Sequence, residues 1–294
     1  MTDRPRTAAI EPAERRAIED WFRARGLPYL VAGDDARDGP LRWLRLLGRS
    51  LVTGFRQRAL EGLADTAAVA VRAMPPLLAV LLFLSMASET WQAFGRLEGW
   101  RYGAVLTGFG LLSLLILTVG LRRDRRALYS PAAGPGLAEA ARRTPARPLV
   151  ERGVVPAGPP LVRAARANIT ATLVEAIALR VLAVGVAVGV AFFLFGLALV
   201  DRGLTAEWVG REPNVLLALR ISGREVVVTE ALVRVATALG AFAALYFSAV
   251  ALGEERNRRE FLDDEVERVE DAMACWSYYR GAIAAGDRAE PPAA

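Results

Sequence analysis

Four long apolar stretches dominate the pattern of the chain, and segments rich in arginine and acidic residues separate them. A helix needs roughly 20 residues to cross the hydrocarbon core of a bilayer. Three of the stretches contain an uncharged run of about this length, which predicts spans at about 102–121, 178–200 and 231–253. The first stretch is uncharged only over residues 73–88, and we expect a span there at about 70–90. The pattern therefore predicts an all-α, four-helix transmembrane protein.

The arginines predict the orientation of these spans. Every basic residue is an arginine, and 28 of the 37 lie within residues 1–66, 122–174 and 254–294. Arginine near the end of a span is retained on the cytoplasmic side of the membrane. We therefore expect these three segments, and so both termini, in the cytoplasm, with the spans in the cytoplasmic (inner) membrane.

The predicted organisation follows from the spans. It comprises cytoplasmic N-terminal amphipathic helices at 1–66, a transmembrane hairpin at 67–121, a cytoplasmic loop rich in Arg, Pro and Gly at 122–174, a second transmembrane hairpin at 175–253 with an outer loop at 201–230, and a cytoplasmic charged helix with a disordered tail at 254–294. Clusters of Pro and Gly at 130–136 and 155–160 predict that the stretch between them is only partly ordered.

Two amphipathic helices are predicted ahead of the first span. Pro12 suits a first helical turn and Gly26 suits the position just past a helix end, so residues 13–25 are expected to form a short helix. Its apolar residues form one stripe, at Ile18, Trp21 and Phe22.

The second of these helices, at 41–63, has a row of arginines opposite an apolar face. This pattern is typical of a helix that lies among lipid headgroups just ahead of a span. The arginines expected to contact the headgroups are Arg42, Arg45, Arg49 and Arg56. The alternative is a helix packed in a cytoplasmic bundle, with the same arginines solvated.

A charged helix is predicted at 258–280, after the last span. Its apolar residues recur at steps of four and three, which makes a heptad seam: Leu262, Val266, Val269, Met273 and Trp276. The seam predicts either a coiled coil or a helix packed on a cytoplasmic neighbour, for which the Ile18 stripe is available. An acidic run at 263–271 is expected to pair with cytoplasmic arginines rather than to hold a cation.

The outer loop of the second transmembrane hairpin contains two strand-like runs, Val215–Ile221 and 225–229, on either side of a turn at Gly223. We expect a small extracytoplasmic β-hairpin there. Both outer loops also contain a Glu followed by a Trp, at Glu89-Thr90-Trp91 and Glu207-Trp208, which suggests that the two halves of the chain are related.

Glycines in the third span predict close helix packing. Gly185, Gly189 and Gly196 approach one face of that helix, and small residues let two helix backbones come together in a membrane. The partner helix could belong to the same chain or to a second copy.

Residues at the edges of spans are the candidate functional residues, because charges and broken helices inside a membrane usually serve a function. They are Arg72, Pro75, Pro76, Glu89 and Arg234. Paired prolines kink a span and free backbone carbonyls. The alternative for Pro75 and Pro76 is a first helical turn, where proline is well tolerated.

Composition removes most enzyme chemistry. The chain has no His and no Lys, and Cys275 is its only cysteine. A histidine base, a lysine nucleophile and a metal site built from His or Cys are therefore excluded. We predict that the protein is not an enzyme and uses no cofactor or metal. The net charge of +5 is expected to reflect topology and attraction to anionic lipid headgroups, with no nucleic-acid partner.

Two segments of the chain resemble uncharacterised multipass membrane proteins of high-GC actinobacteria. They are Arg25-Gly26-Leu27-Pro28-Tyr29-Leu30-Val31 and Arg258-Arg259-Glu260-Phe261-Leu262-Asp263-Asp264. The use of arginine without lysine fits a GC-rich coding sequence. The resemblance implies a multipass membrane protein, and it brings no assigned activity.

The large cytoplasmic part, with its apolar stripes, favours a non-catalytic scaffold or sensor that presents helices to a partner protein. The alternative is a homo-oligomeric channel or small-solute transporter, since four spans enclose a pore only if several copies assemble. An intramembrane enzyme ranks last, because no acidic pair and no nucleophile with a base lies at membrane depth. The expected partners are anionic lipid headgroups, together with a second copy of the chain or a cytoplasmic protein.

Overall fold

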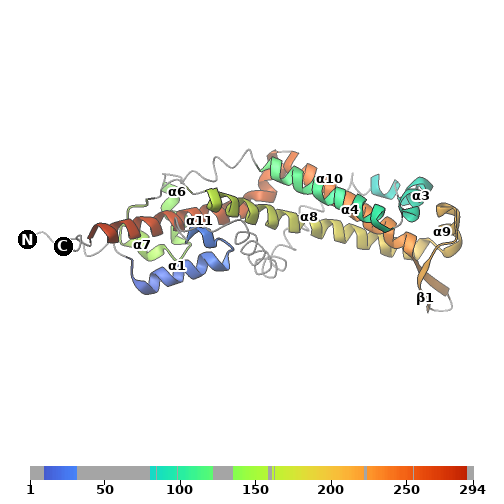
Figure 1. The fold of residues 1–294 in the computed structure, drawn as a ribbon, viewed down its shortest axis with the longest axis horizontal. Coiled ribbons are helices and arrows are strands. Elements are labelled where there is room, and N and C mark those ends of the chain that lie inside the picture. Colours follow the sequence, from blue (N-terminus) through green and yellow to red (C-terminus); the bar gives the residue numbers. More distant parts are fainter. Residues whose placement is uncertain are drawn as a thin grey trace, which may run out of the picture. The chain divides into compact units, whose positions relative to one another are not determined.

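The computed structural model describes residues 10–31, 80–83, 85–97, 99–121, 135–157, 161, 163–221, 224–253 and 255–289. Most of these residues are helical, and they include one small two-stranded antiparallel sheet (Figure 1). Contacts divide the chain into two compact units. Unit 1 takes its residues from Met1–Leu60, Leu121–Ala176 and Leu262–Ala294, and unit 2 from Glu61–Gly120 and Ile177–Phe261.

Three helices in the described part of the chain are long and apolar enough to cross a membrane. They lie in α4 (Gly99–Gly120), α8 (Arg163–Leu199) and α10 (Glu230–Gly253). The predictions of apolar helices of spanning length at about 102–121, 178–200 and 231–253 are therefore confirmed. Helix α8 starts well before its predicted span, and its first residues belong to unit 1.

The span expected at about 70–90 lies mostly outside the described residues, so a four-span count stays a prediction. Its described end is helical at 80–83 and 85–86. The helix stops at Ala87, whose backbone is extended at φ −80° and ψ 120°, and a separate helix, α3 (Ser88–Arg96), begins there. An end at residue 90 is therefore too late. Glu89 lies in the first turn of α3, where a helix dipole favours an acidic side chain.

Unit 2 is built around α10. This helix packs against α4 and α3, and α3 in turn packs against α9 (Arg202–Val209). Asp201 caps the start of α9, because its carboxylate accepts a hydrogen bond from Leu204 N at 2.8 Å, and Gly210 caps the end with φ 74°. The buried core of this unit includes Leu232, Leu239 and Phe247 from α10.

The predicted hairpin is confirmed, with β1 at Val215–Ile221 and β2 at Arg224–Thr229. The strands are antiparallel, with Leu219 opposite Val226 and Ile221 opposite Arg224. One irregularity, between Val215 and Leu217, adds an extra residue to β1. The β-branched residues of β2 favour a strand because they pack well on a pleated surface.

Unit 1 contains α1 (Pro12–Ala24), the 3-10 turn η1 (Pro28–Leu30), α6 (Pro135–Arg142), α7 (Arg147–Glu151), the start of α8 and most of α11 (Glu255–Ala289). The predicted N-terminal helix is confirmed as α1. Gly26 follows it with φ 73°, a left-handed conformation that glycine adopts without strain. From the predicted stripe, Ile18 and Phe22 are completely buried.

Helix α11 is buried on all sides over part of its length. Residues 272–279 are buried consecutively, and Val269, Met273 and Trp276 are only some of its core residues. More side chains of this part of the helix are therefore buried than the predicted heptad seam includes. Ala272, Ala274 and Ser277 lie between the seam residues and are small enough to let neighbouring segments approach from every side. The helix packs on segments of its own chain, which is one of the two arrangements that the seam predicted.

The central loop is more ordered than predicted. Where breaker residues suggested a partly ordered stretch, the chain forms α6 and α7, and both belong to unit 1. Pro135 and Pro148 lie at the beginnings of these helices, where a missing backbone N–H costs nothing. Leu149 of α7 is completely buried. The prolines thus start helices here instead of preventing them.

Candidate functional site

An apolar groove lies in unit 2 between α8 and α10, with Leu106 of α4 beside them, and its volume is about 470 Å³. The residues that line it are Leu106, Leu182, Gly185, Val186, Gly189, Val190, Phe193, Val233, Ala236, Thr237, Gly240, Ala241 and Ala244. Thr237 is the one polar residue in this lining, and its hydroxyl donates to Val233 O at 2.7 Å within the same helix. The groove can therefore accept an apolar chain or helix, but it offers no charge to an ion.

The floor of the groove is made by glycines at the closest approach of α8 and α10. A Cβ atom added to Gly185 would lie 2.8 Å from Gly240 O, and one added to Gly189 would lie 3.2 Å from Ala236 O. A Cβ atom on Gly240 would lie 2.5 Å from Gly185 O. Gly196 faces the side chain of Leu232, which lies nearer the N-terminus of α10. The glycine face that the sequence singled out thus lies against a helix of the same chain.

Arg234 belongs to a polar cluster in the first two turns of α10. Its guanidinium contacts the Glu230 carboxylate and the Leu97 carbonyl, and its side chain is 14% exposed. The Tyr102 ring lies 5.7 Å from the guanidinium carbon, and the Tyr102 hydroxyl donates to Arg234 O at 2.9 Å. Glu230 also accepts a hydrogen bond from the Asn214 amide at 3.2 Å. The charge of Arg234 is compensated within the chain, so this arrangement joins α4 and α10.

A pair of tryptophans links α3 to α9. Trp91 is 2% exposed, its indole N–H donates to Ser85 O at 2.8 Å, and its ring centroid lies 5.3 Å from that of Trp208. Arg96, at the end of α3, donates from Nε to Val209 O at 2.7 Å. Both tryptophans belong to the Glu and Trp sequences that the two outer loops have in common, so the sequence already marked them as a related pair. Glu89, the candidate functional residue in one of these sequences, is exposed at the start of α3.

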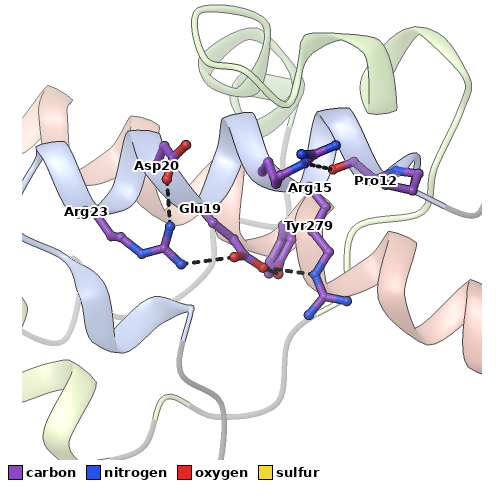
Figure 2. A network of polar contacts seen from close by, with 7 residues as sticks. Pro12, Arg15, Glu19, Asp20, Arg23 and Tyr279 are labelled. Atoms are coloured by element: carbon purple, nitrogen blue, oxygen red, sulfur yellow. Dashed lines mark hydrogen bonds and ion pairs between the residues drawn. The ribbon is translucent and has the colours of Figure 1, made fainter.

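The polar network of Figure 2 joins α1 to α11 in unit 1. The Glu19 carboxylate accepts hydrogen bonds from the Tyr279 hydroxyl at 2.9 Å, from Arg15 Nε at 2.9 Å and from Arg23 at 3.1 Å. Arg23 also pairs with Asp20 at 2.6 Å. Figure 2 shows Tyr279 reaching from α11 to the carboxylate, with Arg15 and Arg23 on either side of it.

The network shifts two pKa values in opposite directions. Burial alone would raise the pKa of Glu19, but the hydrogen bonds from Arg15 and Tyr279 and the charge of Arg15 outweigh it and lower that pKa below its ordinary value. Burial, together with the neighbouring Glu19 carboxylate, raises the pKa of the Tyr279 hydroxyl. Both groups are therefore held in the forms that hydrogen-bond to each other at neutral pH, a carboxylate and a neutral phenol.

Further ion pairs of unit 1 involve the acidic run of α11. Arg143 pairs with Asp271 at 2.8 Å and with Glu267 at 3.1 Å, while Glu265 pairs with Arg268 at 2.9 Å. The predicted pairing of the acidic run with arginines is confirmed for Glu265, Glu267 and Asp271. Within the part of the chain that the structure describes, no three His, Cys, Asp or Glu side chains are grouped so that they could hold a metal ion.

Cys275 lies on α11 and is completely buried. Burial raises the pKa of its thiol to about 11, although a hydrogen bond with the Thr144 side chain acts in the opposite direction. A thiol with so high a pKa is almost entirely protonated at neutral pH and therefore a poor nucleophile. This cysteine is a packing residue.

Several residues proposed from the sequence lie outside the described residues. They are Arg42, Arg45, Arg49 and Arg56 of the proposed headgroup helix, and Arg72, Pro75 and Pro76 at the edge of the first expected span. Their proposed roles stay predictions.

Comparison with protein-family models, with curated proteins and with solved structures found no match to this chain.

Proposed function

We propose that this chain is a non-catalytic integral membrane protein, a scaffold or sensor whose helices outside the membrane present a surface to a partner protein. The observation that supports this most directly is the division of two helices between the units. Helices α8 and α11 each contribute residues both to unit 2, which contains apolar helices of spanning length, and to unit 1, which has its own buried core and many exposed charges. Such a chain anchors a folded helical unit to a membrane.

The surface around the loop 152–157 is the best candidate for contact with the partner. Val155 is 77% exposed, whereas its neighbour Val154 is 4% exposed, and no other large apolar side chain is this accessible among the described residues of unit 1. The loop is held at both ends, because Arg152 pairs with Glu14 of α1 at 2.5 Å and Ala157 N donates to Ser277 O of α11 at 3.0 Å. An apolar side chain is thus displayed outward on a segment that is fixed in place.

The proposed partner is cytoplasmic, because the distribution of arginine favours the cytoplasm for unit 1. Residues 1–66, 122–174 and 254–294 contain 28 of the 37 basic residues, and these ranges include the described helices of unit 1 other than part of α8. In this orientation the hairpin and α9 lie on the outer side of the inner membrane.

Photo-cross-linking in living cells tests this proposal. A photoreactive residue is placed at Val155, or at Arg16 on the exposed side of α1, and the matched control carries it at Leu111 of α4, which is 62% exposed in a predicted span. We expect a discrete protein adduct from Val155 and Arg16 and none from Leu111. Val155→Asp should then weaken the adduct formed from Arg16 while the thermal unfolding of the purified chain stays unchanged, because the side chain is already in solvent.

Two results would overturn the proposal. One is the absence of a protein adduct at both positions of unit 1. The other is ion conductance by the purified chain alone in liposomes, which would favour the homo-oligomeric channel instead.

A further inference from the structure

The β1–β2 hairpin has two chemically different faces. Side chains alternate between the faces of a sheet, and directly paired residues share a face. The register therefore places Leu217, Leu219, Val226 and Val228 on one face, and Ala218, Arg220, Glu225 and Val227 on the other. Arg220 lies opposite Glu225, so the second face has a cross-strand pair of opposite charges. One face is entirely aliphatic, whereas half of the other is charged.

The aliphatic face is open. Leu217 is 50% exposed and Leu219 is 46% exposed, and Leu216 at the irregularity of β1 is 55% exposed. A two-stranded hairpin is marginally stable in water by itself, and a row of exposed leucines adds to the cost of leaving it there. This face requires an apolar partner.

The base of the hairpin is fixed to the first turn of α10. Thr229, the last residue of β2, accepts a hydrogen bond from Leu232 N at 3.2 Å through its hydroxyl, and so caps the helix. Glu230 N donates to Asn214 O at 2.8 Å, and the Asn214 amide donates to the Glu230 carboxylate at 3.2 Å. No linker separates the strand from the helix, so the hairpin starts where the span starts.

Residues outside the hairpin have features typical of a membrane surface at the same end of the spans. The Tyr102 hydroxyl donates to Arg234 O, which ties the first turns of α4 to those of α10. Trp100, in the first turn of α4, is 78% exposed. Exposed tryptophan at the end of a span is typical of the membrane–water interface. These residues support a position of the hairpin base near the membrane–water interface.

We propose that the hairpin is a lipid-surface element, whose aliphatic face rests on the acyl chains of the leaflet at this end of the spans while the Arg220–Glu225 face stays in water. Its free backbone edge cannot be buried in hydrocarbon, because unpaired N–H and C=O groups are too costly there. The hairpin therefore lies in the boundary layer, about 5–10 Å deep, like other amphipathic elements of membrane surfaces.

Cysteine scanning of the full-length protein in phosphatidylcholine vesicles tests the proposal, because the native Cys275 is buried and leaves a low background. Leu217→Cys and Leu219→Cys report on the aliphatic face, and Ala218→Cys and Arg220→Cys are the matched controls on the other face. We expect a water-soluble maleimide to react about tenfold more slowly at the first two positions, since burial of one aliphatic side chain corresponds to at least that factor. A fluorophore attached there should be quenched by lipids brominated on their acyl chains, and one at Ala218→Cys should not.

Three outcomes would overturn the proposal. They are equal reaction rates on both faces, protection of Leu217→Cys without quenching by brominated acyl chains, and disulfide-linked dimers at Leu217→Cys or Leu219→Cys, which would assign the face to a second copy of the chain. If a variant in β1 fails to fold, Val226→Cys and Val228→Cys against Val227→Cys give the same comparison on β2. The expected alternation is then read from three adjacent positions.

Discussion

Among the described glycines of unit 2, Gly240 is one at which a single added methyl group has no room. An added Cβ atom would lie 2.5 Å from Gly185 O and 3.1–3.2 Å from backbone atoms of Gly189. These neighbours are backbone atoms of α8, so no side-chain rotation can make room for it. Gly240→Ala therefore forces α8 and α10 apart, whereas the same change at Gly108 in α4 meets nothing within 4 Å.

The expected loss follows from this comparison. Overpacking a well-packed contact costs about 1–3 kcal/mol. Replacing Gly by Ala inside a helix also gains up to about 1 kcal/mol from helix propensity. This gain is common to Gly240→Ala and Gly108→Ala, so it cancels when the two variants are compared. The difference in free energy of unfolding between them should therefore be about 1–3 kcal/mol, with Gly240→Ala the less stable.

The measurement is reversible unfolding in detergent micelles titrated with dodecyl sulfate, followed by far-UV circular dichroism. Gly185→Ala should behave like Gly240→Ala, because its Cβ atom would lie 2.8 Å from Gly240 O. The double variant should lose less than the sum of the two single losses, since helices that have already separated have room for both methyl groups. Equal stability of Gly240→Ala and Gly108→Ala would refute the close approach of α8 and α10.

Four further predictions concern polar and titratable groups. Burial raises the pKa of Cys275 from 9.0 to about 11, so the stability that its protonated thiol contributes is complete below about pH 9 and is lost as the pH rises to 11. The wild-type chain should therefore lose up to about 3 kcal/mol of unfolding free energy between pH 8 and pH 11 from this group. Denaturant titrations at the two pH values should show that Cys275→Ala lacks this part of the loss. The pKa of Glu19 is lowered in the folded chain, so the pH dependence is reversed. The stability that the Glu19 carboxylate contributes is present above the unfolded-state pKa of about 4 and is lost as the pH falls through the folded-state pKa. A double-mutant cycle of Glu19→Ala and Tyr279→Phe at neutral pH should give a coupling of about 1 kcal/mol, and additive losses would argue against their hydrogen bond. Arg234→Ala removes the contacts of its guanidinium with the Glu230 carboxylate and the Leu97 carbonyl, and should cost about 1–3 kcal/mol in the dodecyl sulfate titration. Arg220→Ala on the exposed strand should cost much less.

Features that depend on a short segment alone could be predicted from the sequence. Hydropathy over about 20 residues indicates a spanning helix regardless of what packs on it, so α4 and α10 were found close to their observed places. The apolar part of α8 was also found, but this helix begins at Arg163, well before its predicted start at about 178. The hairpin followed from β-branched residues around a turn, and α1 from Pro12 and Gly26 at its ends. Each of these signals acts between residues that are near in the chain.

The candidate site was predictable only in part. The sequence singled out Arg234 and the glycines of α8, because charge and small size inside a span are visible in the sequence itself. It could not show that Arg234 contacts the Leu97 carbonyl, nor that Gly185 meets Gly240, because these contacts join segments far apart in the chain. The Arg234–Glu230 pair is different, since the two residues lie one helical turn apart, a spacing that is visible in the sequence. The Trp91–Trp208 contact and the apolar groove likewise depend on segments that are far apart in the chain.

The sequence by itself determined where the chain is apolar, where the arginines accumulate and which chemistry the absence of His and Lys excludes. The tertiary structure alone decided that residues 272–279 of α11 are buried on all sides rather than along one seam, and that Pro135 and Pro148 begin packed helices. The physical reason is the range of the interactions. Hydropathy and turn preference are properties of a segment, whereas burial depends on which other segments surround it, and their approach is set by small residues such as Gly240 and Ala274.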